Sequence, residues 1–186
     1  SRSNVYGTLA NMAEKGAAYI LEGTSVKYGS ISVEEFCTNR IRELTNARKE
    51  LEENIGPPED VREGYITIVG FRNIQNKVYT MLERTGHRLY ISAPISFISS
   101  IREELEALIK SGKKVVVLTD GCLSIRNCDF FLSEKREEQL RLIVDSGYVL
   151  TGDISGENTD TCLYSGQINF VNVFKEAMRN EIELIK

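Results

Sequence analysis

The chain has 186 residues, of which 41% are hydrophobic, and this is enough to bury a core in one or two domains. The net charge of −4 excludes a globally basic surface, so any contact with nucleic acid must come from a local patch. The single histidine and the lack of a CxxC pair disfavour a zinc site, and we expect reduced thiols in a cytoplasmic protein without cofactor or metal. No run of residues approaches the roughly 18 apolar positions of a membrane-spanning helix.

The first 31 residues are predicted to form a short helix followed by a β-hairpin. Ser3 is a candidate N-cap and Gly16 a candidate C′ residue. The apolar stripe of this helix consists of Val5, Leu9 and Met12. Residues 17–21 and 25–28 have the pattern of two strands around a short turn. A helix followed directly by a hairpin is the second half of a winged helix, in which the helix enters the major groove and the hairpin lies on the DNA backbone.

Residues 32–58 are predicted to form a long connecting helix. Ser32 can cap it, with Glu35 completing a capping box, and Gly56-Pro57-Pro58 ends it. Cys37, Ile41, Leu44, Leu51 and Ile55 are the apolar positions, at spacings of four and three, with Arg48 filling the one gap between Leu44 and Leu51. This seam is too narrow for a globular core and suits a coiled coil with a partner helix, so we expect a dimer. The alternative is a surface helix that packs on its own chain.

Residues 59–186 are predicted to form one α/β domain, because strands and helices alternate. The expected strands are 65–69, 89–93, 113–119, 138–144, 148–150 and 161–164, and the expected helices are 71–85, 99–111 and 169–184. The continuous apolar run within 113–119 is typical of a buried parallel strand. The polar segments 122–133 and 154–160 are expected to be loops that can fold over a ligand.

The first 31 residues resemble the recognition helix and wing of the TrmB-type, sugar-responsive transcriptional regulators. The matching positions are Arg2, Ser3, Val5, Tyr6, Leu9, Gly16, Gly23 and Tyr28. The resemblance implies that Arg2, Ser3, Asn4 and Tyr6 contact the DNA groove and that Lys27 contacts the backbone from the wing. The strand and helices that precede this helix in the family do not stand before Ser1. Either the sequence is a fragment or the head does not fold as a whole winged helix.

The order of elements after residue 65 resembles the phospholipase-D-like effector domain of the same regulators. In phospholipase D enzymes, a His-x-Lys-x-x-x-x-Asp signature supplies a histidine nucleophile and a lysine that stabilises the oxyanion. Aligning Asp145 with the aspartate places Glu138 and Leu140 at the histidine and lysine positions. Both chemical groups are therefore absent, and the domain is predicted to bind a ligand without catalysis. The fold class implied is α/β: a partial winged helix, a coiled-coil linker and a phospholipase-D-like sensor domain.

Ligands of open α/β sheets lie beyond the carboxyl ends of the strands, and the resemblance implies a sugar or related small molecule there. Polar and aromatic residues near these ends are Ser92, Thr119, Asp120, Asp153 and Tyr164. The alternative for any one of them, such as Asp120 before Gly121, is a turn former. Few cations lie near these positions, which favours a neutral sugar over a phosphorylated one.

Two other functions remain open at this point. One is a phosphodiesterase that uses His87 and Asp145, and the other is a thiol or metal sensor built on Cys122 and Cys128. The partners predicted for a regulator are DNA, a small-molecule effector and a second copy of the chain.

Overall fold

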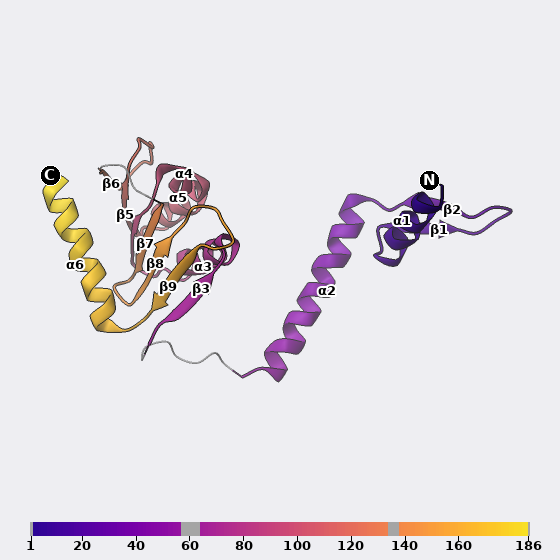
Figure 1. The fold of residues 1–186 in the computed structure, drawn as a ribbon, viewed down its shortest axis with the longest axis horizontal. Helices are drawn as coiled ribbons and strands as arrows, with labels where there is room; N and C mark the ends of the chain where they lie inside the picture. Colours follow the sequence, from indigo (N-terminus) through magenta and orange to yellow (C-terminus); the bar gives the residue numbers. More distant parts are fainter. Residues whose placement is uncertain (1, 57–63, 134–137, 186) are drawn as a thin grey trace. The chain divides into compact units, whose positions relative to one another are not determined.

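The structure, a computed structural model, describes residues 2–56, 64–133 and 138–185. The chain divides into two compact units, Ser1–Pro58 and Glu59–Lys186, and each is described by itself (Figure 1). In the described ranges, no helix combines the length and the apolar character that crossing a membrane requires.

Unit 1 begins with helix α1 (Arg2–Glu14) and a two-stranded antiparallel hairpin of β1 (Ala18–Leu21) and β2 (Lys27–Ser30). Gly16 has a φ of +73°, and its N–H donates to the carbonyl of Ala13 while that of Ala17 donates to Met12. This pattern is a Schellman motif, so the predicted glycine end of the helix is confirmed.

Three expectations for this segment are wrong. Ser3 is not the N-cap, because α1 already includes Arg2. The second strand starts at Lys27, because the turn before it is longer than expected. The expected apolar stripe is not buried within the described part of unit 1, since Val5 is 58% and Met12 is 42% exposed.

The connecting helix α2 (Val33–Asn54) follows the hairpin. The hydroxyl of Ser32 accepts a hydrogen bond from the N–H of Glu35, which confirms the predicted cap. The helix ends at Asn54 with Ile55 as its C-cap, and the predicted proline stop at 57–58 lies outside the described residues. No residue of α2 is buried. Its apolar positions are therefore available to a partner.

Unit 2 contains a seven-stranded mixed sheet with the order β3-β9-β8-β7-β4-β5-β6. The strands are β3 (Ile66–Val69), β4 (Arg88–Ser92), β5 (Lys114–Thr119), β6 (Asp129–Leu132), β7 (Gln139–Val144), β8 (Tyr148–Asp153) and β9 (Thr161–Ser165). Only the pairs β4–β5 and β5–β6 are parallel. The run that predicted a buried parallel strand is β5, in the interior of the sheet, so this expectation is confirmed.

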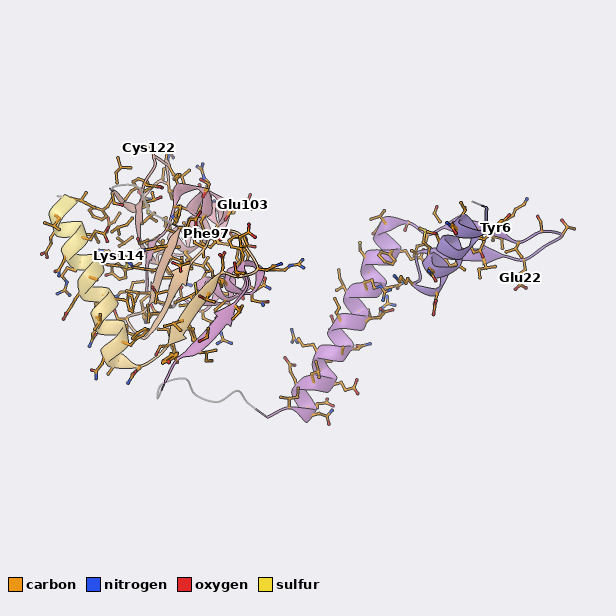
Figure 2. The ribbon with its side chains drawn as sticks, viewed as in Figure 1. Tyr6, Glu22, Phe97, Glu103, Lys114 and Cys122 are labelled. Carbon is orange, nitrogen blue, oxygen red and sulfur yellow. The ribbon has the colours of Figure 1, made fainter. Side chains whose placement is uncertain are left out.

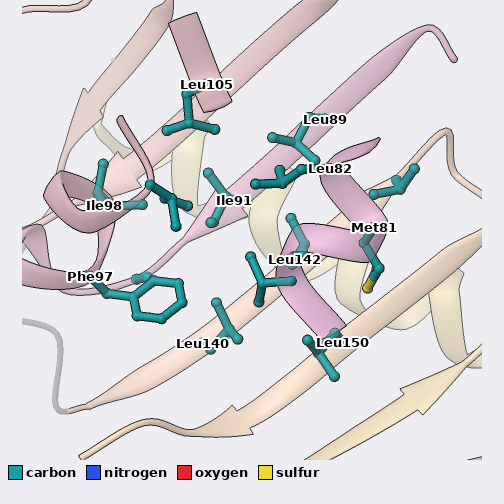
Figure 3. Close-up of a cluster of buried hydrophobic side chains, with 14 of the residues drawn as sticks. Met81, Leu82, Leu89, Ile91, Phe97, Ile98, Leu105, Leu140, Leu142 and Leu150 are labelled. Atoms are coloured by element: carbon teal, nitrogen blue, oxygen red, sulfur yellow. The ribbon is translucent and has the colours of Figure 1, made fainter. Parts of the chain in front are cut away.

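Four helices cover the sheet: α3 (Phe71–Glu83), α4 (Ile95–Ser100), α5 (Arg102–Lys110) and α6 (Ile168–Ile185). The larger core lies between one face of the sheet and α3, α4 and α5 (Figure 3). Its labelled members include Leu82, Leu89, Ile91, Phe97, Leu105 and Leu142. A smaller core, with Val171 and Met178 of α6, lies on the other face. The apolar face predicted for α3 is confirmed.

Two expectations for unit 2 are wrong in detail. The helix predicted from residue 99 begins at Ile95 and is interrupted at Ile101, so it forms two short helices. The segment predicted as a loop, 122–133, contains β6, whose backbone pairs with β5 from Asp129 to Leu132. In both cases a contact with a distant part of the chain creates the element.

Candidate functional site

The helix–hairpin part of unit 1 carries the residues predicted to contact DNA. Asn4, Tyr6 and Lys27 are exposed, and Tyr6 is marked on α1 in Figure 2. Lys27 pairs in register with Leu21, at the end of the hairpin next to its turn. Arg2 and Ser3 belong to α1 by their backbone, but their side chains lie outside the described residues. Contact of these residues with DNA stays a prediction.

Two contacts tie the helix–hairpin to α2. The hydroxyl of Tyr19 in β1 donates to Oε1 of Glu35, and this hydrogen bond raises the pKa of Tyr19. The guanidinium of Arg40 donates to the carbonyl of Lys15, just after α1, at 2.8 Å. The junction between α1 and β1 is therefore attached to the first half of α2, so a displacement of α2 would move the helix–hairpin with it.

The predicted seam of α2 faces solvent within unit 1. Its exposed side chains are Ile41 (64%), Leu44 (71%), Leu51 (56%) and Ile55 (64%). Ion pairs along the helix join Arg40 to Glu43 and Arg48 to Glu52, and Arg48 fills the gap in the seam between Leu44 and Leu51. A stripe of exposed large apolar side chains between charged flanks has the pattern of a helix that pairs with another helix.

Three of the predicted effector residues lie where β4 and β5 end. Ser92 and Thr119 are buried, and Asp120 is half-buried. Oδ1 of Asp120 accepts a hydrogen bond of 2.8 Å from the N–H of Ile95 at the start of α4. A Cβ at Gly121 would come within 2.9 Å of the Ile95 side chain. Asp120 and Gly121 therefore position α4, which is a structural role whether or not a ligand binds nearby.

The other two predicted effector residues are not brought together with Ser92. Ser92 pairs with Leu118 in register and so faces the α6 side of the sheet. Tyr164 lies in the larger core on the opposite face, stacks on Tyr148, and has Nζ of Lys77 at 3.5 Å from its ring centroid. Asp153 is exposed at the end of β8. The five residues do not line one cavity, and their role as effector ligands stays a prediction.

The positions aligned with the phospholipase D signature lie along β7. Glu138 is exposed just before the strand, and Leu140 is fully buried in the larger core. Glu138 is not the histidine of the signature, and the aliphatic side chain of Leu140 cannot supply the positive charge of its lysine. These two positions therefore lack the chemistry of phosphodiester cleavage.

Asp145 has a structural role at the β7–β8 turn. Its carboxylate accepts hydrogen bonds of 2.7, 2.8 and 2.8 Å from the backbone N–H groups of Gly86, His87 and Arg88. Burial opposes ionisation and is the largest single effect on this carboxyl, but the three hydrogen bonds together lower its pKa. The turn is thereby attached to the loop before β4. The side chain of His87 is exposed at this end of the sheet.

Two hollows in unit 2 contain none of the predicted effector residues. One, of about 170 Å³, lies between α6 and the sheet and is lined by Tyr90, Ile143, Met178 and Ile182. The other, of about 550 Å³, lies between α5 and residues 124–127. Arg102 and Lys110 of this second hollow could not be predicted as site residues from the sequence, because charged residues on an amphipathic helix are typical of a solvated face.

The cysteines form no disulfide and no metal centre in the part of the chain that the structure describes. Cys122 is exposed, whereas Cys128 is half-buried and its Sγ lies 3.5 Å from the carbonyl of Val115. Burial raises the pKa of Cys128 to about 11, and Asp129 adds to this effect. A thiol with a raised pKa holds little of the reactive thiolate at neutral pH.

The comparisons with known proteins identify the family. Residues 64–156, half of the chain, match the family model described as the N-terminal subdomain of the effector-binding domain of transcriptional regulator TrmB. The chain belongs to the TrmB family of transcriptional regulators. No curated protein sequence matches it.

Solved structures confirm the predicted fold. TrmBL2, described as an archaeal chromatin protein with a novel mode of DNA binding, is 18% identical with a TM-score of 0.57, and the match covers 100% of this chain and 83% of that one. NucT from Helicobacter pylori is 14% identical with a TM-score of 0.54, and the match covers 64% of this chain and 95% of NucT. The α/β, phospholipase-D-like architecture is therefore confirmed, as is the resemblance to TrmB-type regulators.

Proposed function

We propose that this chain is part of a dimeric, DNA-binding transcriptional regulator of the cytoplasm, whose second unit binds a sugar or related small molecule without catalysis. The observation that carries the proposal is the family match of residues 64–156 to an effector-binding subdomain. In the same chain, unit 1 consists of a helix, a hairpin and a connecting helix in which no residue is buried. Such a regulator needs a DNA-reading head, a connector and a sensor, and these roles are assigned to α1 with the hairpin, to α2 and to unit 2.

The DNA-binding role is assigned to the start of α1 and to the hairpin. Arg2, Ser3, Asn4 and Tyr6 would contact base edges and phosphates in the major groove, and Lys27 would contact a phosphate from the wing. Asn4, Tyr6 and Lys27 are exposed, which this role requires. The wing carries one lysine beside Glu22, so its electrostatic contribution to affinity is small.

Dimerisation is assigned to the seam of α2. Pairing of two copies would bury Ile41, Leu44, Leu51 and Ile55, which otherwise remain exposed to water. Because Glu35 and Arg40 attach the helix–hairpin to α2, a change in the pairing of α2 would change the spacing of two reading heads. An effector that binds the two arrangements with different affinity would thereby change DNA binding.

The sugar-binding role is assigned to the edge where β4, β5 and β8 end. Thr119, Asp120 and Asp153 lie at this edge, and their hydroxyl and carboxylate groups suit a polyol. Ser92 is the last residue of β4 and is buried, whereas Tyr164 is on the other face of the sheet and would act only through the packing of β9.

The two other functions are less well supported. For a phosphodiesterase that uses His87 and Asp145, the carboxylate of Asp145 is already engaged by three backbone N–H groups. For a thiol sensor, the raised pKa of Cys128 disfavours reaction. Phosphodiesterase activity that disappears in His87→Ala would favour the first, and loss of a response to oxidant or metal in a Cys122→Ser, Cys128→Ser variant would favour the second.

The direct test is a DNA-binding titration of the chain extended by the strand and helices that complete a winged helix. We expect this protein to bind DNA with an affinity that falls steeply as salt rises, and to prefer a selected sequence over a random one. A sugar that raises the melting temperature of the protein should change the affinity for the selected sequence. A folded, complete winged helix without DNA affinity would contradict the proposal.

A further inference from the structure

The second hollow, between α5 and residues 124–127, is called the groove along α5 below. The proposed function assigns no role to its residues. Arg102, Glu106 and Lys110 are spaced by four along α5 and form one wall. Residues 124–127 form the other, with Arg126 among them. Its volume of about 550 Å³ lies in the usual range of small-molecule pockets, and it shares no residue with the sheet edge proposed for the sugar.

The groove carries an excess of positive charge in a chain whose net charge is −4. Nε of Arg102 donates to Oε1 of Glu106 at 2.7 Å, and this hydrogen bond is the main reason that the pKa of Glu106 is lowered. Arg102 and Glu106 thus compensate each other. Within the described residues, Lys110 and Arg126 have no ion pair; the charge of Lys110 also acts on Glu106 and lowers its pKa, whereas that of Arg126 remains for a ligand.

The two walls are attached to each other and to the core. A second nitrogen of Arg102 donates to the carbonyl of Ser124 at 3.0 Å and so connects α5 to the opposite wall. Ile125, between Ser124 and Arg126, is buried in the larger core. Because these contacts exist without a ligand, binding would not have to order the segment that carries Arg126.

We propose that this groove binds a small phosphorylated metabolite. Phosphate oxygens are acceptors that guanidinium and ammonium groups bind well, and Lys110 and Arg126, which form no ion pair, come from opposite walls of the groove. A compact ligand with anionic groups can contact both at once. The regulator would then respond to an anionic metabolite at a site separate from the sugar site.

The test uses the full chain and inorganic pyrophosphate as the probe. Isothermal titration should detect binding of pyrophosphate, with no equal effect from chloride at matched ionic strength. We expect Lys110→Gln and Arg126→Gln each to weaken pyrophosphate binding roughly three- to tenfold, since each removes one exposed charge contact. The matched control is Arg72→Gln, which removes an exposed arginine from α3 and should leave the affinity unchanged.

Three results would overturn the proposal. They are undetectable binding of pyrophosphate to the folded chain, an equal loss of affinity in Arg72→Gln, and loss of DNA affinity in Arg126→Gln without any effect on pyrophosphate. The last would make the groove a nucleic-acid contact. A sugar response that persists in all variants is expected, and it would show that the sugar site and this groove are separate.

Discussion

The two units of this chain use their apolar residues in opposite ways. In unit 2, the apolar side chains of β4, β5 and β7 are buried between helices, and Ile91, Val117 and Leu142 have no exposed surface. In unit 1, no residue of α2 is buried, and Leu44 is 71% exposed. Both units have patterned sequences, but only the pattern of unit 2 is satisfied within the described chain.

The apolar residues of unit 2 therefore stabilise its own fold, whereas those of α2 are suited to binding a partner. Burying a leucine or isoleucine side chain contributes about 1.5–3 kcal/mol, and unit 2 gains this within its own fold. The exposed apolar side chains of α2 would gain this stabilisation on contact with a partner, such as a second copy of the chain. Substitutions in the two units should therefore affect different measurements.

The largest effect is expected in the core of unit 2. Ile91→Ala leaves a cavity in the middle of the sheet and should lower the free energy of unfolding by about 2–5 kcal/mol. Leu44→Ala removes a similar volume from α2 and should change the unfolding of unit 2 hardly at all. Chemical denaturation followed by circular dichroism measures both. An equal loss in the two variants would contradict the contrast between the units.

The next effect concerns the β7–β8 turn. Asp145→Asn removes the charge that three backbone N–H groups bind, and it should lower the free energy of unfolding by about 2–3 kcal/mol at neutral pH. The folded state lowers the pKa of Asp145, so its stabilisation is present above the ordinary carboxyl pKa and is lost as pH falls through the folded value.

The pH dependence gives the control for this prediction. The parent should lose stability as pH falls below about 4, and Asp145→Asn should lose less over the same range. The pKa of Asp160 is also lowered, so the parent and the variant should both still lose some stability at acid pH. Parallel stability curves for the two proteins would show that the charge of Asp145 does not matter.

A smaller effect is expected on DNA binding, with none on folding. In a chain with a complete winged helix, Arg2→Ala should cost about 1–3 kcal/mol of binding free energy and relax sequence preference if Arg2 contacts a base. Lys27→Ala should weaken binding to all sequences alike and reduce the salt slope by about one. Fluorescence anisotropy with selected and random DNA distinguishes these outcomes. If Arg2→Ala also affects both DNAs equally, Arg2 contacts only phosphate.

The smallest effect is expected at Asp120. Because its carboxylate accepts the N–H of Ile95, Asp120→Ala should lower the free energy of unfolding by about 1 kcal/mol without any ligand. If Asp120 also binds the sugar, the ligand-induced rise in melting temperature should disappear in a thermal shift assay. A retained ligand response together with the lower stability would make Asp120 a structural residue only.

The sequence predicted best what local chemistry determines. Ser32 with Glu35 correctly predicted the start of α2, and Gly16 the end of α1. The apolar run before Thr119 correctly predicted β5. Local signals could not predict α4, because the group that accepts the first N–H of this helix comes from Asp120, which lies 25 residues later in the sequence. They could not predict β6 either, because its residues form a strand by pairing with β5.

The candidate sites were harder to predict, because a site depends on which face of the sheet each side chain occupies. Ser92 and Tyr164 both lie near strand ends, but a shift of one residue in register reverses the face, and they occupy opposite ones. The groove along α5 depends on residues 124–127, and only the fold places Arg126 opposite Lys110.

The exposed seam of α2 is the proposed dimer contact, and sedimentation equilibrium is the measurement that tests this proposal. We expect the parent chain to sediment as a dimer and the Leu44→Asp, Leu51→Asp variant to shift toward monomer, because two charges would be buried in the seam. The control is Asn46→Asp with Lys49→Gln, which changes the net charge of α2 equally on its outer face and should remain dimeric. A double aspartate variant that sediments like the parent would contradict the account.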